Sequence, residues 1–353
     1  MSKSKDLFFA LLRNALWHTE ECLPSDLPEK MAERIFSIAG QQTVLGLVCD
    51  ALIRNDVKMP QKYVIKAWGL LEQIRRANNL LNNELKVFVQ LPIKDYVVVK
   101  GQTVAALYPD PNIRMSGDID FLVHDYGSAN VVLKREWNVK LPQRLIDKET
   151  AFLHGSVTYE IHTSLMEFGY WRHRQEWQKL MQRKCGFVLV DGVQVQTLEP
   201  TVYAVYVFVH LFFHFIREGI GLRQMCDWAV ILDRYKDDID PSQLTTDLDG
   251  LGLKRAYRAF GGVLIAHLGL RTFPLPLDEK DKKDSERILK DILRYGNFGK
   301  PSRKVQEFGW KFKMETMGRT VRNCWKYFRL APAEIAMIIP RLVVLNAKLI
   351  FSR

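Results

Sequence analysis

The sequence predicts an α+β protein, with a small mixed β-sheet flanked by N-terminal and C-terminal helical regions. Apolar residues recur at helical spacing through residues 1–90 and again from residue 200 onward. Short β-branched segments are instead confined to residues 91–197. With 353 residues, 47% of them hydrophobic and 26% charged, the chain has the composition of a globular protein and the length of two or three domains.

The N-terminal region is predicted to be helical. Within Leu7–Leu16, apolar residues stand at i, i+1, i+4 and i+5, which places them on one side of a helix. The same pattern continues in residues 31–54 and in residues 64–88. The segment Asn55–Pro60 breaks the pattern and is expected to separate the two helical stretches.

Short strands are predicted next, because β-branched and aromatic residues dominate them. A hairpin ends this region, since Asp191-Gly192 provides suitable residues for a type I′ turn. Helices are expected between the first three strands. The predicted strands are Asp95–Lys100, Asp118–Val123, Ser156–His162, Phe187–Val190 and Val193–Gln196, and the predicted helices are Gln102–Leu107 and Gly127–Trp137.

The chain is predicted to be helical again from Glu199 onward, and Pro200 stands where a proline is tolerated in the first turn of a helix. Val202–Val209 is rich in residues that favour strands, but the length of the apolar run favours a buried helix. Further helices are expected at residues 222–235 and 253–268. The charged run Asp278–Arg287 is interpreted as an exposed connection that leads into a helix.

Most of the net charge of +11 lies in residues 300–353. This segment has twelve Lys or Arg and three Glu, a net charge of +9, so the remaining +2 belongs to the first 299 residues. A basic amphipathic tail suits an anionic partner such as a membrane surface, nucleic acid or another polyanion, although a solvated helix face has the same pattern. The predicted organisation is an N-terminal helical region, a sheet-containing core, a helical domain and the tail, at residues 1–90, 91–197, 198–299 and 300–353.

Cysteine usage and the apolar runs bear on the compartment. Five scattered cysteines without a C-x-x-C motif argue against a disulfide framework or a zinc ribbon and favour a reducing compartment. The apolar run Leu7–Leu12 is too short for a secretory signal, and the longest charge-free stretch, Thr201–Ile216, is shorter than the roughly 20 residues of a membrane span. We therefore expect a cytoplasmic protein without a transmembrane span, and the basic tail allows peripheral attachment to the inner membrane surface.

The most informative segment is Asp118-Ile119-Asp120, at the start of a predicted strand. Residues i and i+2 of a strand point to the same face, so Asp118 and Asp120 present two carboxylates side by side. Like charges that close need a cation or a proton, and Mg²⁺ prefers carboxylate oxygens while keeping positions open for phosphates. A magnesium–phosphate site is the functional interpretation, and an Asp-rich turn before a strand is the structural alternative.

Glu160 and His162 share one face of another predicted strand by the same period of two. A buried acid is costly unless a metal or a basic partner compensates it. Glu160 is therefore a candidate third metal ligand, and an edge-strand Glu facing water is the alternative. His162 is expected to orient Glu160 or to contact phosphate.

These segments carry a family resemblance. The pattern K-G-x-x-x-x-x-L-Y-P-x-x-x-x-R-x-S-G-D-I-D-F-L-V at residues 100–123, followed by Y-E-I-H at residues 159–162, resembles the polymerase-beta-like nucleotidyltransferases. It is most similar to the bacterial group called uncharacterised nucleotidyltransferases, over about residues 95–235. The resemblance implies a short mixed sheet backed by helices. It also implies metal-dependent transfer of a nucleoside monophosphate from a nucleoside triphosphate, for example ATP, to a hydroxyl acceptor.

The resemblance places Asp118, Asp120 and Glu160 on the three metal-binding carboxylates, which are expected to hold two Mg²⁺ ions, with Mn²⁺ as an alternative. The family turn is commonly Gly-Ser or Gly-Gly. This chain instead has Gly101-Gln102-Thr103, so Thr103 is expected to supply the hydroxyl to the triphosphate. Abortive-infection nucleotidyltransferase toxins have a similar Lys-Gly turn, which keeps tRNA among the acceptors. The residues expected to bind the nucleotide are Lys100, Gly101, Thr103, Arg114, Ser116, Gly117, His162 and Arg223.

Three residues of the helical region are secondary candidates. His210 and His214 are four residues apart and so share a helix face. They lack the intervening acid of H-E-x-x-H, so we expect core or hydrogen-bonded histidines, with lining of the nucleotide cleft as the alternative. Arg223 either neutralises triphosphate charge or pairs with Asp227.

Two other functions remain open. The D-x-D pattern also occurs in metal-dependent glycosyltransferases that use sugar nucleotides, and the chain could be a nucleotide-binding regulatory or scaffold protein without turnover. Release of pyrophosphate would indicate nucleotidyl transfer, whereas release of a nucleoside diphosphate would indicate glycosyl transfer. The residues do not distinguish a small molecule, a saccharide, a protein or RNA as the hydroxyl acceptor.

Overall fold

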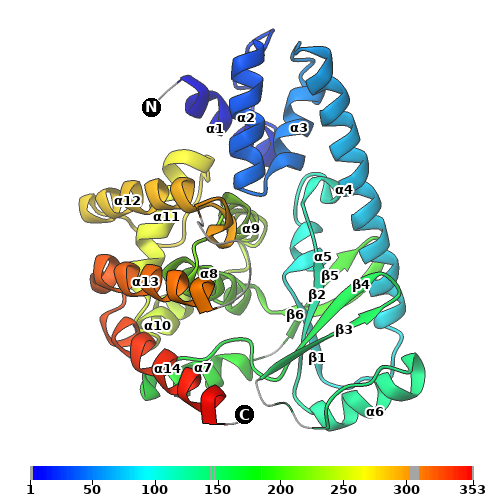
Figure 1. Cartoon of the computed structure of the whole chain (residues 1–353), viewed down its shortest axis with the longest axis vertical. Coiled ribbons are helices and arrows are strands. Elements are labelled where there is room, and N and C mark those ends of the chain that lie inside the picture. The colour runs from blue at the N-terminus through cyan, green and yellow to red at the C-terminus, as the bar shows by residue number, and fades with distance from the viewer. Residues whose placement is uncertain (1–2, 144, 146–147, 184, 303–309, 352–353) are drawn as a thin grey trace. The chain divides into compact units, whose positions relative to one another are not determined.

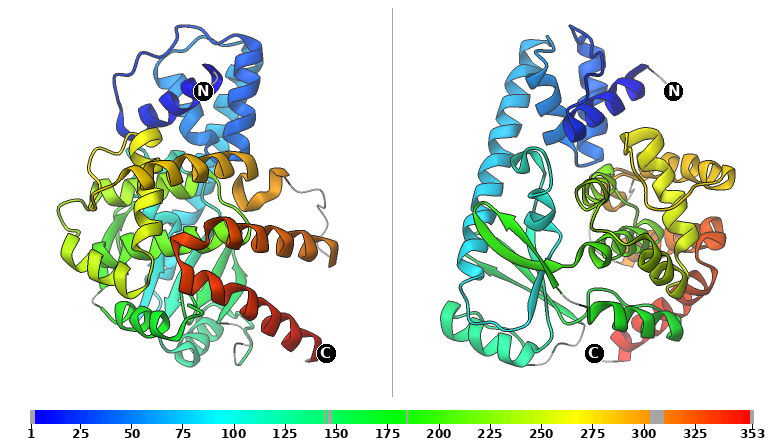
Figure 2. Two further views of the ribbon diagram at one scale, coloured as in Figure 1. Left: turned by 90° about the vertical axis from the view of Figure 1, so that its left-hand side faces the viewer. Right: turned by 180° about the vertical axis from the view of Figure 1, so that it is seen from behind.

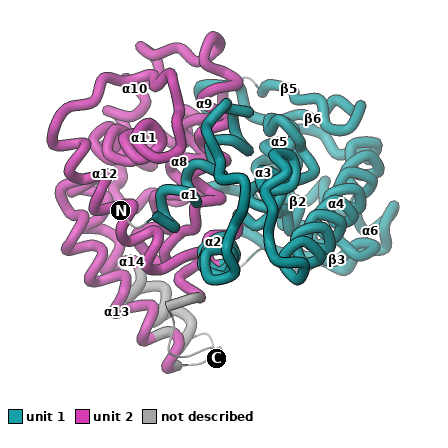
Figure 3. The backbone as a smooth tube through the Cα atoms, turned by 90° about the horizontal axis from the view of Figure 1, so that it is seen from above, with its two compact units in different colours: residues 1–40, 44–165, 184–203 teal, residues 41–43, 166–183, 204–353 magenta. Residues whose placement is uncertain are grey.

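The structure is a computed structural model that describes residues 3–143, 145, 148–183, 185–302 and 310–351. It combines a small mixed sheet with many helices, which confirms the predicted α+β class (Figure 1). The chain forms two compact units, coloured separately in Figure 3. The division of the sequence into four regions remains a prediction. The first unit contains residues 1–40, 44–165 and 184–203, and the second contains residues 41–43, 166–183 and 204–353.

The first unit begins with helices and then forms the strands. Its elements are α1 (Lys3–Trp17), α2 (Glu29–Gln41), α3 (Leu45–Arg54), α4 (Gln61–Phe88), β1 (Tyr96–Val99), α5 (Gly101–Ala105), a 3-10 turn η1 (Pro111–Ile113), β2 (Asp118–Val123), α6 (Tyr126–Trp137), β3 (Glu149–His154), β4 (Val157–His162), β5 (Cys185–Val190) and β6 (Val193–Leu198). The expected break at Asn55–Pro60 separates α3 from α4, as predicted. Residues 31–54, predicted in one helical stretch, form parts of two helices, because Thr43 between them has a φ of 58°.

The four-stranded sheet has the order β1-β2-β4-β3. β2 runs parallel to β4, whereas β1 and β3 run antiparallel to their neighbours. The three strands predicted for this sheet are confirmed as β1, β2 and β4. β3 was not predicted, because Glu149–His154 is an edge strand in which half of the residues are exposed and no apolar alternation is seen.

One face of the sheet packs against α4, which runs alongside the strands (Figure 2). The ring of Phe88 lies 4.6 Å from that of Phe121 and 5.8 Å from that of Tyr159, measured between centroids. Phe121 and Tyr159 alternate along their strands with Asp120 and Glu160. The apolar face of the sheet is therefore covered by a helix, and the two carboxylates project from the opposite face.

The predicted hairpin forms a separate two-stranded sheet of β5 and β6. Asp191 and Gly192 both have positive φ, 45° and 82°, as the two central residues of a type I′ turn require. The side chain of Thr197 in β6 donates a hydrogen bond of 2.8 Å to the carbonyl of Val98 in β1. The hairpin is thereby fastened to the edge of the larger sheet.

The second unit is helical around the apolar helix α8. The ring of Phe208 packs against those of Trp228, Tyr257 and Phe260. The first residues of α8, up to Tyr203, belong to the first unit, and the rest of this helix belongs to the second. The elements of the second unit are α7 (Trp171–Met181), α8 (Pro200–Arg217), α9 (Leu222–Arg234), α10 (Pro241–Gly250), α11 (Lys254–Leu268), α12 (Glu279–Tyr295), η2 (Asn297–Ser302), α13 (Trp310–Tyr327), η3 (Phe328–Leu330) and α14 (Pro332–Phe351). The predicted buried helix at Val202–Val209 is confirmed within α8. Among the described residues, α8 is also the one helix long and apolar enough to cross a membrane, but 78% of it is buried in the protein, as in a core helix.

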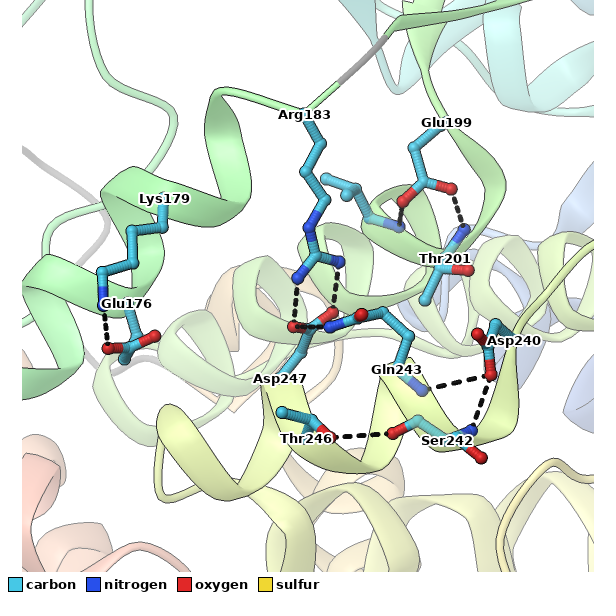
Figure 4. Close-up of polar contacts among 11 residues, drawn as sticks. Glu176, Lys179, Arg183, Glu199, Thr201, Asp240, Ser242, Gln243, Thr246 and Asp247 are labelled. Atoms are coloured by element: carbon cyan, nitrogen blue, oxygen red, sulfur yellow. Dashed lines mark hydrogen bonds and ion pairs between the residues drawn. The ribbon is translucent and has the colours of Figure 1, made fainter.

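Helix starts explain both a success and an error of the sequence predictions. Pro200 begins α8, and the carboxylate of Glu199 accepts hydrogen bonds from the N–H groups of Thr201 and Val202 (Figure 4).

The run Asp278–Arg287 is not a connection. Asp278 caps α12 by accepting hydrogen bonds from two backbone N–H groups, so nearly the whole charged run is helical.

Two helices of the second unit were not predicted. α7 is strongly polar, and α10 is short, beginning with Asp240 as its N-cap. The guanidinium of Arg183, just after α7, forms two hydrogen bonds with the carboxylate of Asp247 in α10, one of them 2.6 Å long (Figure 4). Of the charged residues assigned to the tail, Arg303, Lys304, Glu307 and Arg353 lie outside the described residues.

Candidate active site

Asp120 lies at the centre of a polar cluster on the open face of the sheet. In the parallel pair of β2 and β4, Asp120 is the direct partner of Glu160, and Leu122 is the partner of His162. The Asp120 carboxylate is almost fully buried, and its Oδ1 atom is 3.0 Å from His162 Nε2 and 3.1 Å from Lys100 Nζ. His162 Nε2 also lies 3.8 Å from Glu160 Oε2. Strand register therefore brings Asp120 to Glu160 and His162, about 40 residues further along the chain, and Lys100 joins them from 20 residues earlier.

The donor set of this cluster fits a divalent cation. One oxygen each from Asp120 and Glu160 and one nitrogen of His162 lie within 4.8 Å of one another. Carboxylates suit Mg²⁺ and Mn²⁺, and imidazole is a frequent additional ligand of transition metals such as Mn²⁺. Asp118, expected to be a ligand, is not a member of this group; it lies half-buried at the start of β2. His162 is the third member of the group, and the part of Asp118 as a ligand remains a prediction.

The environment sets the protonation of the cluster. Burial disfavours the charged form of Asp120, but the charge of Lys100 and the hydrogen bond from His162 outweigh it and lower its pKa to about 2. Burial, followed by repulsion from Asp120 and Asp118, raises the pKa of Glu160 to about 7. Burial opposes protonation of His162, but its hydrogen bonds to Asp120 and Glu149 raise its pKa to about 9. Without a ligand, His162 and Lys100 therefore neutralise Asp120 at neutral pH.

Lys100 stands in a sharp turn between β1 and α5. Its φ and ψ are 57° and −148°, a region that non-glycine residues rarely adopt, so the surrounding structure must hold this conformation. Gly101 follows with a φ of 45°, and a Cβ atom there would lie 3.0 Å from the carbonyl oxygen of Asp118. Glycine thus meets two requirements at this position: positive φ and close approach to the strand that carries the carboxylates.

A ring of three hydrogen bonds fixes this turn. The N–H of Lys100 donates to the hydroxyl of Tyr203 at 3.0 Å, and the hydroxyl of Thr103 donates to the carbonyl of Lys100 at 2.7 Å. The Thr103 and Tyr203 oxygens are 2.6 Å apart. Because the proton of Thr103 is already used, Tyr203 is the donor in this third bond. Thr103 was expected to offer its hydroxyl to the triphosphate, but it is fully buried and bonded within the protein.

The other turn residues are also held from within the unit. The Gln102 side chain is buried and donates to Asn82 of α4. Arg114 is buried, and its guanidinium donates to the hydroxyl of Ser116 at 2.8 Å. Gly117, directly before β2, is exposed. Gly117 is therefore accessible and Ser116 is partly exposed, whereas the buried Arg114 holds the Ser116 hydroxyl through a hydrogen bond.

Comparison with known proteins agrees with this arrangement. Residues 28–268 match the family described as uncharacterised nucleotidyltransferase. The chain belongs to this family. The resemblance expected from the D-I-D and Y-E-I-H segments is thereby confirmed, and this nucleotidyltransferase is assigned an enzymatic role in nucleotidyl transfer.

Other comparisons add little to the family assignment. No protein with a curated description matches the chain. Among solved structures, an antigenic nucleotidyltransferase-like protein from Paracoccidioides brasiliensis is similar, with 14% identity and a TM-score of 0.29 over 56% of this chain and 93% of the other. A TM-score of this size does not establish a common fold.

Two residues of the nucleotidyltransferase site were missed by the sequence predictions. Glu149 Oε2 in β3 lies 3.4 Å from His162 Nδ1, on the side of the ring opposite Asp120, and this contact is the main reason that the pKa of Glu149 is lowered. Tyr203 belongs to the apolar helix α8, and its hydroxyl bonds to a turn 100 residues earlier. The residues next to Tyr203 in the sequence give no indication of this contact. Neither residue has a sequence signal, because each depends on a partner from a distant segment.

The secondary candidates belong to the second unit of the nucleotidyltransferase. The rings of His210 and His214 are 4.4 Å apart between centroids, as their spacing on one helix face predicts. They form no metal-ligand group with other described residues; His214 instead lies 3.8 Å from the carboxylate of Glu218. The backbone N–H of Arg223 donates to the carbonyl of Gln42. A part for Arg223 in nucleotide binding remains a prediction.

Proposed function

We propose that this nucleotidyltransferase is metal-dependent and moves a nucleoside monophosphate from a nucleoside triphosphate to a hydroxyl acceptor, with release of pyrophosphate. The family supports nucleotidyl transfer in general. The observation that carries the metal dependence is the convergence of Asp120, Glu160 and His162 within 4.8 Å on the open face of the sheet. A buried carboxylate with a pKa of about 2 is an anionic anchor at every physiological pH.

The residues of the cluster have different roles in the proposed reaction. Asp120, Glu160 and His162 would hold a divalent cation, with Asp118 beside them to complete a second position. A bound cation neutralises triphosphate charge and lowers the pKa of the acceptor hydroxyl. Lys100 adds a positive charge that stabilises the leaving pyrophosphate. The bond between the acceptor oxygen and the α-phosphorus forms, the bond from that phosphorus to the pyrophosphate oxygen breaks, and the acceptor proton passes to a carboxylate or to water.

The turn residues are assigned to shaping the nucleotide site. Gly101 lets the Lys100 turn approach β2, and Thr103 holds that turn. Ser116 and Gly117 would meet the phosphates at the edge of the cluster, with Arg114 behind them. ATP, Mg²⁺ and Mn²⁺ are the first ligands to test. The acceptor class is the part of the function that an experiment must supply.

The test is transfer of label from α-labelled nucleoside triphosphates to an acceptor, with equimolar release of unlabelled pyrophosphate, in the presence of Mg²⁺ or Mn²⁺. We expect Asp120→Asn to reduce transfer by about 100-fold or more, because the anchor loses its charge. Asp56→Asn makes the same chemical change at an exposed turn residue and should leave transfer unchanged. Undiminished transfer by Asp120→Asn would contradict the proposal. Release of a nucleoside diphosphate would indicate a glycosyltransferase, and binding without turnover for any acceptor would indicate a regulatory protein.

A further inference from the structure

Helix α13 of the second unit carries an apolar stripe on its exposed side. Met314, Val321 and Trp325 stand at i, i+7 and i+11, which is the spacing of one helix face. These side chains are 63%, 43% and 88% exposed. The other side of the helix already packs against the unit, where Thr320 and Asn323 are buried. The stripe is therefore additional to the packing face, and within the described residues no element covers it.

A groove with a volume of about 590 Å³ continues this stripe between α13 and α14, which are neighbouring helices (Figure 2). Trp325 and Phe328 form its aromatic wall, and Phe328 is 46% exposed. Ile335 and Ile339 of α14 line the opposite side. An open, largely apolar groove beside a nearly fully exposed tryptophan is unusual on a monomeric soluble protein and marks an interaction site.

The rim of the groove is positively charged. Arg287 of α12, Lys326 and Arg329 line it, and no acidic side chain of the described part of the chain does. Lys326 is partly neutralised by Asp291 at 2.6 Å, and Arg287 lies 3.6 Å from a carboxylate oxygen of Asp284. Arg329 is exposed. The surface thus joins apolar side chains to guanidinium groups, which together suit a ligand that is both apolar and anionic.

We propose that the α13–α14 surface docks the enzyme on a membrane that contains anionic phospholipids. Tryptophan favours the boundary between headgroups and acyl chains, where its ring is amphipathic like its surroundings. Arg287 and Arg329 would meet lipid phosphates, and stable attachment requires such a pair of apolar and basic signals. Trp325 and Phe328 are also able to stack on bases, but the aliphatic Ile335 and Ile339 that share the groove match acyl chains rather than bases, so lipid fits better than nucleic acid.

This proposal goes beyond nucleotidyl transfer and gives the predicted peripheral location a defined surface. It places the enzyme on the inner, anionic leaflet of the cytoplasmic membrane. It uses no residue of the candidate active site. Asp120→Asn should consequently bind vesicles as the unaltered protein does, so failure of one proposal is distinguishable from failure of the other.

The experiment is co-sedimentation of the full chain with vesicles of phosphatidylglycerol and phosphatidylcholine, and with vesicles of phosphatidylcholine alone. We expect binding to the anionic vesicles that weakens with salt and falls about tenfold or more in Trp325→Ala and in Arg287→Glu/Arg329→Glu. Trp68→Ala removes another exposed tryptophan, 52% exposed, from α4 and should have no effect. Lys283→Glu/Lys290→Glu makes the same change in net charge on exposed positions of α12 outside the groove and should retain most of the binding.

Four results would overturn the proposal. They are the absence of vesicle binding, equal binding to neutral vesicles, and equal loss of binding in the control variants. The fourth is a concentration-dependent dimer or an RNA complex that Trp325→Ala abolishes while vesicle binding persists, since the surface would then serve a second copy of the chain or RNA. Circular dichroism of each variant checks that the helices are retained.

Discussion

The hydroxyl of Tyr203 in α8 accepts a hydrogen bond from the backbone N–H of Lys100 at 3.0 Å and so supports, from a distant segment, the turn that Thr103 holds locally. The turn needs this support because Lys100 has a backbone conformation that non-glycine residues rarely adopt. The same lysine places its ammonium group 3.1 Å from Asp120. Tyr203 is therefore a positioning residue for the charge that faces the proposed metal site.

Replacing Tyr203 by phenylalanine tests this role. The variant leaves two buried partners without their hydrogen bond, at a cost of about 1–3 kcal/mol, and lets the Lys100 turn relax. We expect about a tenfold loss in kcat with a smaller change in KM. Tyr206→Phe removes a hydroxyl from another buried tyrosine three residues along α8 and should keep kcat. Equal losses of kcat in both variants would show a general effect on α8.

The identity of the third ligand is a second test. The structure groups His162, and not Asp118, with Asp120 and Glu160. We therefore expect His162→Gln to weaken Mn²⁺ binding about tenfold or more, and Asp118→Asn to weaken it less. Isothermal titration of the full chain with Mn²⁺ measures both. His124→Gln changes an exposed histidine directly after β2 and is the control. The opposite ranking would restore the ligand set expected from the sequence.

Metal binding should also depend on pH. Without metal, burial and the neighbouring carboxylates raise the pKa of Glu160 to about 7, and hydrogen bonds overcome the effect of burial to raise that of His162 to about 9. Both groups must lose a proton to act as ligands, so protons compete with the cation below these values. We expect Mn²⁺ affinity to rise from pH 6 to pH 8, by up to about tenfold per pH unit for each proton released. An affinity independent of pH would exclude both groups as ligands.

A fourth prediction concerns the stability of the second unit. The buried carboxylate of Glu334 in α14 accepts hydrogen bonds from the backbone N–H groups of Gly169 and Tyr170 and contacts His173 Nδ1 at 3.2 Å. Glu334→Gln puts an amide nitrogen where only acceptors are needed, which should cost about 1–3 kcal/mol and lower the Tm. Thermal unfolding followed by circular dichroism measures the change, with Glu315→Gln on α13 as the control. An unchanged Tm would mean that α14 is held by other contacts.

Much of the fold follows from local sequence patterns. β2 is predictable from its short apolar, β-branched run and β4 from its alternation of apolar with polar residues, and the β5–β6 turn is predictable because Asp191 and Gly192 tolerate positive φ. β3 escapes prediction, since an edge strand needs no apolar alternation. The first turns of α12 were mistaken for a connection because their charges are those of a capped, exposed helix.

The composition of the site is only partly predictable, for a different physical reason. Strand periodicity shows that Asp118 and Asp120 share one face of their strand, and that Glu160 and His162 share one face of theirs. The register between β2 and β4 decides which of the four meet, and it pairs Asp120 with Glu160. Register depends on packing between segments, so a single strand does not reveal it. The same holds for Tyr203, whose partner is about 100 residues away.

The contact between Lys100 and Asp120 has a consequence for the order of events during turnover. An internal ammonium group already occupies one oxygen of this carboxylate, so a divalent ion held through that oxygen would displace it. The displaced ammonium group would then be available to the triphosphate. Ion and nucleotide are thus thermodynamically linked, and each should tighten the binding of the other by the same factor.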